Sequence, residues 1–443
     1  MRRGGGRLSR GPSRGLRRHH PSRSPGLGLV ERPGSDTRPD RPAAFHCGWL
    51  LDGSGAGARR DVVLTVAGGR IDDIFPAVEG YQGLAPLDWR AFTVLPPLVD
   101  AHVHLFLSGR NDPVLRRRQL DPGPEYVFRH MADRIRRYLR RGILAVRDGG
   151  DHGALALALR DRYRQGRPDG FVLRAAGRAW HRAGRYGGVF GRSPAENQRL
   201  AEAVAADGRG IDQVKIINSG INSLTDFGRQ TRPQFDPDDL KAAVAAAHRR
   251  GLPVMVHANG VQPVADALAA GCDSIEHGFF MGETNMARMA ARETIWVPTA
   301  GTMAGCLGTL APGSPEADGA RRLLDHQVAQ LARARALGVT VAAGTDAGSP
   351  GVRHGRAMAT ELGLMTAAGY CLGETVRCAA AHGARLLGLD RPGVLRPGAP
   401  ADFIAVTGPP EALWKSLEQV RAVYRNGLPL SSSLALPGMT AGG

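Results

Sequence analysis

Two histidines separated by one residue, His102 and His104, are the side chains in this sequence best suited to chemistry. They lie in residues 94–105, whose apolar and β-branched residues predict a short buried strand. Side chains two positions apart on a strand point to the same face, so both imidazoles converge on one point. Two imidazoles at one point suit a divalent transition metal. A structural histidine pair is the commoner meaning of an isolated His-x-His motif, so the prediction requires further ligands.

Four further residues at the ends of strand-like runs supply such ligands. Lys215 lies in a β-branched run where an unpaired ammonium would be costly, and His257 and His277 each end a run about one βα unit apart. Asp346 follows another run, in a turn flanked by glycine. Each residue alone has an ordinary explanation, such as a hydrogen-bonded core histidine, a helix cap or a lysine at a strand edge. Together, in the order His-x-His, Lys, His, His, Asp, they predict a single site.

This ordered set resembles the metal-dependent amidohydrolase superfamily, and the flanking residues are similar to its imidazolonepropionase-like and Xaa-Pro dipeptidase-like branch. The resemblance extends over residues 45–428. It includes Leu-Asp-Gly-Ser-Gly at 51–55, Ala-Val-Arg-Asp-Gly at 145–149, and the Gly- and Pro-rich stretch at 393–406 that contains Asp402. Two features depart from the family pattern, namely Pro97 in place of a common glycine and the segment 378–385, but neither removes a ligand.

The resemblance implies a metal centre with defined roles. His102, His104 and Asp346 would hold one divalent ion, His257 and His277 would hold a second, and a carboxylated Lys215 would bridge them. We expect two ions, with Zn²⁺ as the expected metal, and a single ion as the alternative. Asp346 is the expected general base and later the proton donor to the leaving nitrogen.

Other polar residues near these runs are weaker candidates for substrate binding. His181, Asn218, Ser219 and His354 lie in loops that follow or flank the ligand positions, and a purely structural loop role is the alternative for each. The remaining histidines in helical sequence are expected to face solvent or to pack between helices; they are His248, His326 and His382.

The expected activity is metal-dependent hydrolysis of a C–N bond by a metal-activated hydroxide. The substrate would be a cyclic amide, an N-acyl amino acid or a dipeptide-like small molecule. A lactone or ester hydrolase with the same centre is the alternative among enzymes. A non-catalytic scaffold with a basic tail associated with nucleic acid is the alternative outside enzymes.

The elements that must position these residues alternate regularly along the chain. Between residues 125 and 388, helical and strand patterns follow one another, for example a helix over 236–251 that Asp236 can cap and Gly251 can end. Repeated βα units with buried strands predict an α/β fold, here a (β/α)8 TIM barrel. The expected domains are a disordered tail at 1–42, the barrel at 96–389 and a second disordered tail at 432–443. The flanks at 43–95 and 390–431 show short alternating strands, which by resemblance form a small β-sandwich.

Composition separates the charged tail from the rest of the chain. Of the formal charge of +17, residues 1–42 contribute +8, from eleven arginines against Glu31, Asp36 and Asp40. Because no aromatic residues lie among these arginines to stack on bases, we do not expect nucleic acid as a partner. The five cysteines lack Cys-x-x-Cys spacing and are expected to be reduced. No stretch has the length of a membrane span or the apolar region of a signal peptide, so we expect a cytoplasmic location, with a homo-oligomer left open.

Overall fold

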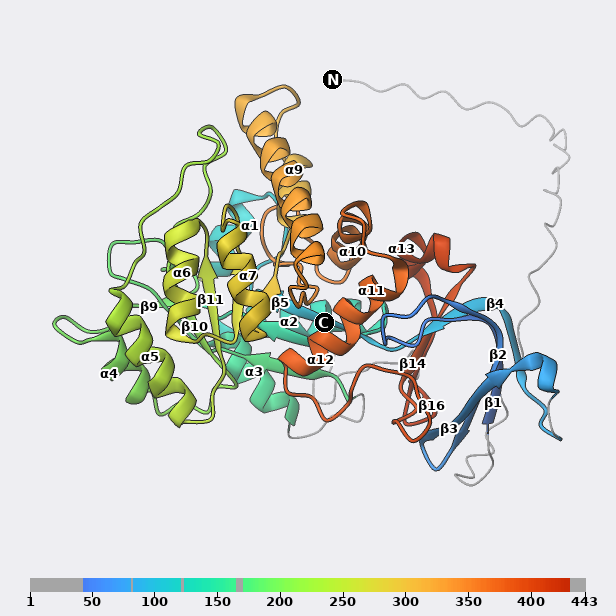
Figure 1. Ribbon diagram of the computed structural model, residues 1–443. Coiled ribbons are helices and arrows are strands. Elements are labelled where there is room, and N and C mark those ends of the chain that lie inside the picture. The colour runs from blue at the N-terminus through green and yellow to red at the C-terminus, as the bar shows by residue number, and fades with distance from the viewer. Residues whose placement is uncertain (1–42, 81–82, 121–122, 165–169, 431–443) are drawn as a thin grey trace, which may run out of the picture. The chain divides into compact units, whose positions relative to one another are not determined.

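Parallel strands from the middle of the chain form two sheets in the computed structural model (Figure 1). The first contains β5 (Leu98–Val103), β6 (Ile143–Asp148) and β7 (Val172–Ala175). The second has the order β13-β12-β11-β10-β8-β9, with β8 (Ala179–Trp180), β9 (Gly191–Arg192), β10 (Val214–Ile217), β11 (Val254–Ala258), β12 (Ser274–His277) and β13 (Ile295–Val297). The longer strands are buried along their whole length, as parallel strands covered on both faces are.

An extended segment at residues 339–347 lies between the outer strands of these two sheets. On one side Trp296 N donates to Thr340 O at 2.9 Å, and on the other Ala101 N donates to Ala343 O at 2.9 Å. The sequence predicts a regular strand here, but the structure has only isolated bridges, from Val341 to β13 and from Ala347 to β5. Asp346 interrupts the regular pattern because its φ of 53° lies in the left-handed region. The described strands therefore form two parallel sheets rather than one continuous eight-stranded sheet.

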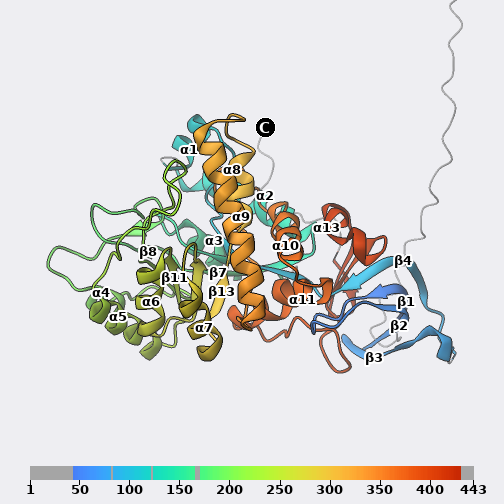
Figure 2. The ribbon, with the colours of Figure 1, turned by 45° about the horizontal axis from the view of Figure 1, so that its top comes forward.

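Helices connect the strands and cover them on the outside. In Figure 2, α4 to α7 follow one another as an outer layer over the second sheet. The helices are α1 (Pro113–Leu120), α2 (Pro124–Leu139), α3 (Leu155–Arg164), α4 (Leu200–Ala205), α5 (Pro237–Arg249), α6 (Val261–Ala270), α7 (Glu283–Arg292), α8 (Gly301–Leu307), α9 (Pro315–Ala336), α10 (Ala357–Ala367), α11 (Leu372–Arg377), α12 (Gly383–Leu386) and α13 (Leu413–Ser416). Short helical turns lie at Ala77–Glu79, Cys378–His382, Pro410–Ala412 and Leu417–Gln419.

The helix expected at 236–251 shows why these elements begin and end where they do. The Asp236 carboxylate accepts hydrogen bonds from the backbone N–H groups of Asp238 and Asp239, which satisfies donors that a helix start leaves free. Gly251 follows the helix with φ 69°, a conformation that glycine adopts without steric cost. The α5 helix is thus followed closely by β11, in which His257 is the last residue but one.

The two flanks of the chain meet in one seven-stranded sheet, seen in blue and red in Figure 1. Its order is β16-β15-β14-β4-β1-β2-β3, with β1 (Ala43–Leu50), β2 (Arg59–Ala67), β3 (Arg70–Pro76), β4 (Leu87–Leu95), β14 (Phe403–Thr407), β15 (Val420–Arg425) and β16 (Leu428–Pro429). The flanks join where β4 and β14 pair antiparallel, with Leu95 opposite Ile404. An aromatic cluster of Phe45, Trp89, Phe403 and Tyr424 packs against this sheet. The expected sandwich is therefore seen as a single sheet built from both flanks.

The structure describes residues 43–80, 83–120, 123–164 and 170–430. The predictions of disordered tails at 1–42 and 432–443 fall outside these residues. No described helix is both long and apolar enough to cross a membrane.

Candidate metal centre

The six residues predicted as metal ligands all line one small pocket. His102 and His104 come from the end of β5, Lys215 from β10, His257 from β11 and His277 from the last position of β12. Asp346 comes from the extended segment beside β5, where its backbone N–H donates to the His102 carbonyl at 2.7 Å. Three further residues complete the lining, Tyr186, Phe190 and Ile217. Side chains far apart in the sequence are thus brought together at the carboxyl ends of parallel strands.

Each of the four histidines uses one ring nitrogen on a neighbour and leaves the other for a ligand. His102 Nδ1 lies 2.7 Å from Glu276 Oε2, and His104 Nδ1 lies 3.0 Å from the Gly150 carbonyl. His257 instead uses Nε2, at 3.1 Å from the Gly220 carbonyl, and His277 Nδ1 lies 2.7 Å from Thr299 Oγ1. The partners of His102, His104 and His257 are a carboxylate or carbonyls, which can only accept, so they fix the proton on the nitrogen facing them and leave the lone pair that a metal needs on the opposite nitrogen. The Thr299 hydroxyl that faces His277 can accept or donate.

Asp346 lies beside His102 and His104, on one side of the proposed ligands. One of its oxygens, Oδ1, lies 3.5 Å from His104 Nε2 and 3.8 Å from His102 Nε2, and the ligand atoms of these three residues all lie within 4.8 Å of one another. The other oxygen accepts from Ser349 Oγ at 2.9 Å. Burial raises the pKa of Asp346 to about 7, although the Ser349 hydrogen bond lowers it. A cation held among these residues would favour the carboxylate form.

Two buried polar atoms at the site have no hydrogen-bond partner among the described residues, His102 Nε2 and Lys215 Nζ. An orphaned polar atom in the interior costs free energy unless something else satisfies it. Burial lowers the pKa of the Lys215 ammonium to about 8, so the amine loses its proton more readily than an exposed lysine does. The neutral amine is the form that adds CO₂. These residues therefore fit a metal centre, with or without carboxylation of Lys215.

The four histidines are held in their neutral form. Burial lowers the pKa of His104 and of His257 to about 3, and it places the pKa of His102 and His277 well below the ordinary value. Neutral imidazole is the protonation state that coordinates metals.

Backbone strain occurs at two of the proposed ligands. His277 has φ 67° and Asp346 has φ 53°, both in the left-handed region that side chains other than glycine rarely adopt. The His277 carbonyl accepts from Trp296 Nε1 at 3.0 Å and from Gln327 Nε2 at 2.6 Å, so neighbouring elements hold this conformation in place. Strain of this kind persists where surrounding structure over-determines it, which is common at functional sites.

A buried cluster behind His102 was not predicted from the sequence. Glu276 accepts from Arg147 Nη2 at 2.7 Å and from Ser274 Oγ at 2.5 Å, while its second oxygen faces His102. Arg147 Nε also donates to the Ala101 carbonyl on β5 at 2.7 Å, so the cluster links β5, β6 and β12. One signal could have indicated it. Arg147 and Glu276 are charged residues within fully buried strands, where an unpaired charge is unfavourable.

The residues expected to bind substrate do not line the pocket. Asn218 Nδ2 donates to the Pro263 carbonyl, and Ser219 Oγ donates to the Gly220 carbonyl and accepts from Asn259 N. His354 lies between the Leu107 carbonyl, at 2.7 Å, and the Tyr138 hydroxyl, at 3.1 Å. His181 Nδ1 faces the Arg182 carbonyl at 3.0 Å. These hydrogen bonds lie in the loops near the pocket, and substrate binding by the four residues stays a prediction.

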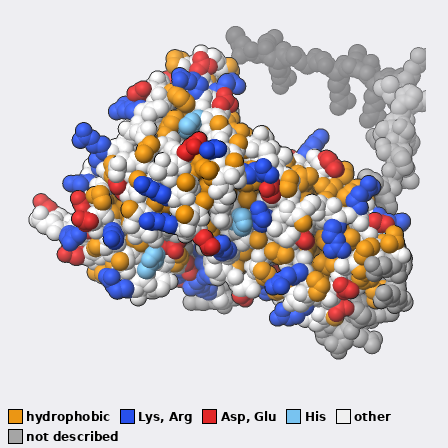
Figure 3. Space-filling view, in the orientation of Figure 1, with side chains coloured by type: hydrophobic (Ala, Val, Ile, Leu, Met, Phe, Trp, Pro, Cys, Tyr) orange, Lys and Arg blue, Asp and Glu red, His pale blue; other side chains and the backbone are white. Residues whose placement is uncertain are grey.

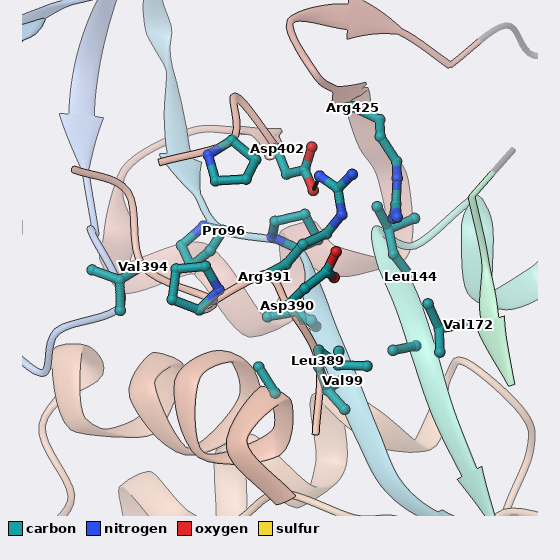
Figure 4. A pocket seen from close by; sticks show the side chains of 17 residues that line it. Pro96, Val99, Leu144, Val172, Leu389, Asp390, Arg391, Val394, Asp402 and Arg425 are labelled. Carbon is teal, nitrogen blue, oxygen red and sulfur yellow. Dashed lines mark hydrogen bonds and ion pairs between the residues drawn. The ribbon is translucent and has the colours of Figure 1, made fainter. Parts of the chain in front are cut away.

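A separate apolar crevice lies at the other ends of the strands (Figure 4). Leu98 and Val172, the first residues of β5 and β7, line it together with the segment that contains Arg391 and with Asp402. Arg391 Nη1 and Asp402 Oδ2 form an ion pair at 2.5 Å, shown as a dashed line. None of the proposed metal ligands lines this crevice. It is a contact region between the parallel strands and the flanking sheet rather than a catalytic pocket.

Comparison with known proteins agrees with the ligand set. The sequence model of the amidohydrolase family matches residues 93–429, most of the chain. The chain belongs to the amidohydrolase family. The prediction of this family from the sequence is confirmed.

The relatives of this amidohydrolase include both uncharacterised proteins and enzymes. An uncharacterised protein of Mycobacterium tuberculosis is 31% identical over 336 residues, which are 72% of this chain and 80% of that protein. Ochratoxinase of Aspergillus niger is 30% identical over 48% of this chain and 45% of its own length. The imidazolonepropionase of Saccharopolyspora erythraea is 26% identical over 87% of this chain and 95% of its own.

Solved structures show the same fold. A Xaa-Pro dipeptidase crystallised with methionine in its active site has a TM-score of 0.73 and 28% identity, over 88% of this chain and all of that chain. The A. niger ochratoxinase structure has a TM-score of 0.70 at 21% identity, over 88% of this chain and 95% of that chain, which supports the fold alone. With its family membership and enzyme relatives, the protein is an enzyme, a hydrolase acting on carbon–nitrogen bonds.

Proposed function

We propose that this enzyme is a metal-dependent hydrolase of a small amide, with an N-acyl amino acid, a dipeptide-like molecule or a cyclic amide as substrate. The observation that carries the proposal is the convergence of His102, His104, Lys215, His257, His277 and Asp346 on one buried pocket. In that pocket, His102 Nε2 and Lys215 Nζ have no hydrogen-bond partner among the described residues. The Xaa-Pro dipeptidase and ochratoxinase relatives support an amide as the bond that is cleaved.

The donor set would hold two divalent ions, with Zn²⁺ as the proposed metal. One ion would be held by His102, His104 and Asp346. The other ion would be held by His257 and His277, and a carboxylated Lys215 would be a ligand to both ions. When bound, such ions lower the pKa of a coordinated water and polarise the substrate carbonyl.

Asp346 would move the proton. Its Oδ1 faces the two histidines of β5, while its Oδ2 is held by Ser349, so the carboxylate is fixed at the centre of the site. We propose that Asp346 takes a proton from the attacking water and delivers it to the nitrogen that leaves. Because Oδ2 accepts from Ser349 Oγ, Oδ1 is the oxygen that would carry the proton.

We infer further that the two parallel sheets close into a (β/α)8 barrel. β10 pairs with β8, and Asp212 N, just before β10, donates to Ala175 O of β7 at 3.0 Å. On the other side, residues 339–347 contact both β13 and β5 through backbone hydrogen bonds. The metal centre would then lie at the carboxyl-end mouth, where such barrels carry their active sites.

The test is metal content together with activity on a panel of N-acyl amino acids, dipeptides, cyclic ureides and lactones. Wild-type protein should bind close to two metal ions and hydrolyse at least one amide. Asp346→Asn should keep the fold and most of the metal but lower kcat by roughly 10²- to 10⁴-fold, the range of general acid–base catalysis.

Lys215→Ala should lose metal, and short carboxylates in the buffer should restore part of it by replacing the carbamate. Lys241→Ala, an exposed lysine on α5, is the matched control and should change neither property. A wild type that binds no metal, or an Asp346→Asn variant with undiminished kcat, would overturn the proposal. If the protein hydrolyses lactones but no amide, the proposed function becomes that of an ester hydrolase.

A further inference from the structure

His277 differs from the other three proposed histidine ligands in the partner of its second ring nitrogen. The other three each face a carboxylate or a backbone carbonyl, whereas His277 Nδ1 lies 2.7 Å from the hydroxyl oxygen of Thr299. A hydroxyl can donate or accept, so it is compatible with either tautomer of the imidazole. The tautomer that leaves a lone pair on Nε2 for a metal requires the Thr299 hydroxyl to accept.

Thr299 is held in a strained backbone conformation between β13 and α8. Its φ of 48° lies in the left-handed region, which β-branched residues rarely adopt. The residue is fully buried, and its carbonyl accepts from both the backbone N–H and the hydroxyl of Thr302. Strain of this kind persists only where the surrounding structure over-determines it. The contact between Thr299 and His277 is therefore built into the fold rather than left to a freely rotating loop side chain.

Glu361 on α10 holds the two residues that follow Thr299. One of its oxygens accepts from Ala300 N at 3.1 Å, and the other accepts from Gly301 N at 2.6 Å. The side chain is fully buried. Burial raises the pKa of Glu361 to about 8, although the two backbone hydrogen bonds lower it. The proposed mechanism does not use this carboxyl group, and both of its hydrogen bonds go to the turn that carries Thr299.

A second buried side chain, Gln327 on α9, holds the other side of the same contact. Its Nε2 donates to the His277 carbonyl at 2.6 Å and to the Pro298 carbonyl at 2.9 Å. Pro298 directly precedes Thr299, so one amide group links the end of β12 to the residue after β13. In Figure 2, α8, α9 and α10 lie beside one another. Two outer helices thus each contribute one polar side chain that fixes Thr299 against His277.

We propose that Thr299 is a positioning residue for the second metal ion, the ion assigned to His257 and His277, and that Glu361 sets the position of Thr299. The hydroxyl would accept from His277 Nδ1–H and so keep the Nε2 lone pair directed at the ion. Glu361 would keep the turn at residues 298–301 in the one conformation that brings the hydroxyl to the imidazole. The inference rests on the proposed metal centre and adds what controls one of its two ions.

Two substitutions of Thr299 separate its hydroxyl from its shape. Competition with a chelator on the full chain measures the affinity for each zinc ion. Thr299→Val keeps the β-branched shape but removes the hydroxyl, so the affinity for one ion should fall by about 10- to 100-fold while that for the other stays within about threefold. Thr299→Ser keeps the hydroxyl and should stay near the wild type for both ions. In a His257→Ala background, which removes the other histidine of the second ion, Thr299→Val should have no further effect.

Thr375→Val is the matched control for the loss of a hydroxyl. Thr375 is also fully buried, and its hydroxyl donates to the Cys371 carbonyl on the other side of α11 from the metal ligands in sequence. This variant should leave both zinc affinities unchanged.

Glu361→Gln tests whether the carboxyl group acts through Thr299. The NH₂ group of glutamine cannot accept from a backbone N–H, so one of the two hydrogen bonds is lost and the turn shifts. We expect weaker binding of the same ion, and the double variant with Thr299→Val should bind it no more weakly than Thr299→Val alone, because effects that pass through one contact are not additive. Asp239→Asn is the matched control, since Asp239 likewise accepts from two backbone N–H groups, Leu200 N and Ala201 N, at the start of α4.

The outcomes distinguish this inference from the proposed function. If Thr299→Val binds both ions like the wild type, or if Thr299→Ser loses as much affinity as Thr299→Val, the inference is wrong even when amides are hydrolysed. Fully additive losses in the double variant would exclude Glu361 from the role, and if Glu361→Gln does not fold, the Thr299 variants decide alone. If the affinities shift as expected but no C–N substrate is hydrolysed, the inference stands and the proposed function fails. A wild type that binds no zinc overturns both.

Discussion

The charge on one buried carboxylate, Glu276, decides which nitrogen of His102 is available to a metal. Because a carboxylate oxygen of Glu276 paired with Arg147 can only accept, it places the His102 proton on Nδ1, and the lone pair on Nε2 then points into the pocket. Arg147 compensates the charge on Glu276 with a hydrogen bond at 2.7 Å, and all three side chains are almost completely buried. The cluster is thus a positioning device for the metal centre rather than a participant in the reaction.

Glu276→Gln tests this role by replacing an acceptor with a group that can also donate. Its amide can keep an acceptor toward Arg147 while its NH₂ faces His102 Nδ1, which moves the imidazole proton to Nε2. We expect zinc affinity to fall by about 10- to 100-fold, the usual cost of losing such a partner. The melting temperature should also fall, because Arg147 loses its buried counter-charge. Competition with a chelator and thermal unfolding measure the two effects.

Glu374→Gln is the control, since Glu374 pairs with Arg335 at the surface and should affect neither quantity. Unchanged zinc affinity in Glu276→Gln would show that the carboxylate does not set the tautomer of His102.

At this scale the sequence identified the residues that converge but not what holds them. The order of His-x-His, Lys, His, His and Asp was informative because parallel strands end at one edge, so order along the chain becomes proximity. The partners of these residues come from other strands or from backbone carbonyls, such as Gly150 and Gly220, which carry no side-chain signal. Tyr186 was not predicted because a tyrosine in a glycine-rich loop has no periodicity to mark it.

At the scale of elements, a loop rather than a helix supplies Tyr186 and Phe190 to the wall of the metal pocket. Residues 181–190 connect β8 and β9, and we call them the roof segment. One buried side chain joins this segment to residues 218–234, among the green and yellow-green connections near β9 to β11 in Figure 1. Gln234 Oε1 accepts from Arg182 N at 2.9 Å, and its Nε2 donates to the carbonyls of Tyr186 and Ser219 at 2.9 and 3.0 Å. This glutamine ties the roof segment to the loop that follows Lys215.

Gln234→Ala should loosen the roof segment selectively. It removes three hydrogen bonds and leaves buried backbone groups unpaired, which costs on the order of 1–3 kcal/mol for each group left unsatisfied. Amide hydrogen exchange within residues 181–190 should accelerate by tenfold or more, while exchange in β10 to β12 and the metal content stay unchanged. Gln198→Ala, whose side chain accepts only from Ala195 N within its own loop, is the control. If amide exchange within residues 181–190 accelerates equally in Gln234→Ala and Gln198→Ala, Gln234 does not hold this segment in place.

The elements themselves could be predicted where pattern and capping agree. The helix at 236–251 and the strands ending at His257 and His277 were indicated by caps, glycine stops and β-branched runs, and they are present as α5, β11 and β12. The strand at 339–343 was predicted on the same pattern but is irregular, because Gly344 and the left-handed Asp346 break the alternation that a ladder needs. That irregularity belongs to the site, since it turns the Asp346 side chain toward His104.

At the scale of the whole molecule, the charge on the visible face differs in its distribution from the charge of residues 1–42. On the face seen in Figure 3, Lys and Arg side chains are scattered among Asp, Glu and apolar side chains, with no continuous basic stripe. Many arginines are paired with carboxylates, for example Arg160 with Asp212 and Arg335 with Glu374. Nearly half of the net charge of +17 lies instead in residues 1–42, outside the described part of the chain.

The last prediction concerns this basic tail. Residues 1–42 carry eleven arginines and few apolar residues, so they can bury too little surface to offset the entropy of ordering them. Deletion of residues 1–42 should therefore leave the melting temperature within about 1 °C, and kcat/KM within about twofold, of the values for the full chain. Loss of a packed segment that contributes even about 1 kcal/mol to the free energy of unfolding would shift the melting temperature by more than that. Deletion of residues 1–50, which also removes β1 from the centre of the flanking sheet, is the opposite control and should abolish folding. A large loss of stability or activity on removing residues 1–42 alone would show that the tail packs on the enzyme, and salt dependence of that loss would assign the contact to its arginines.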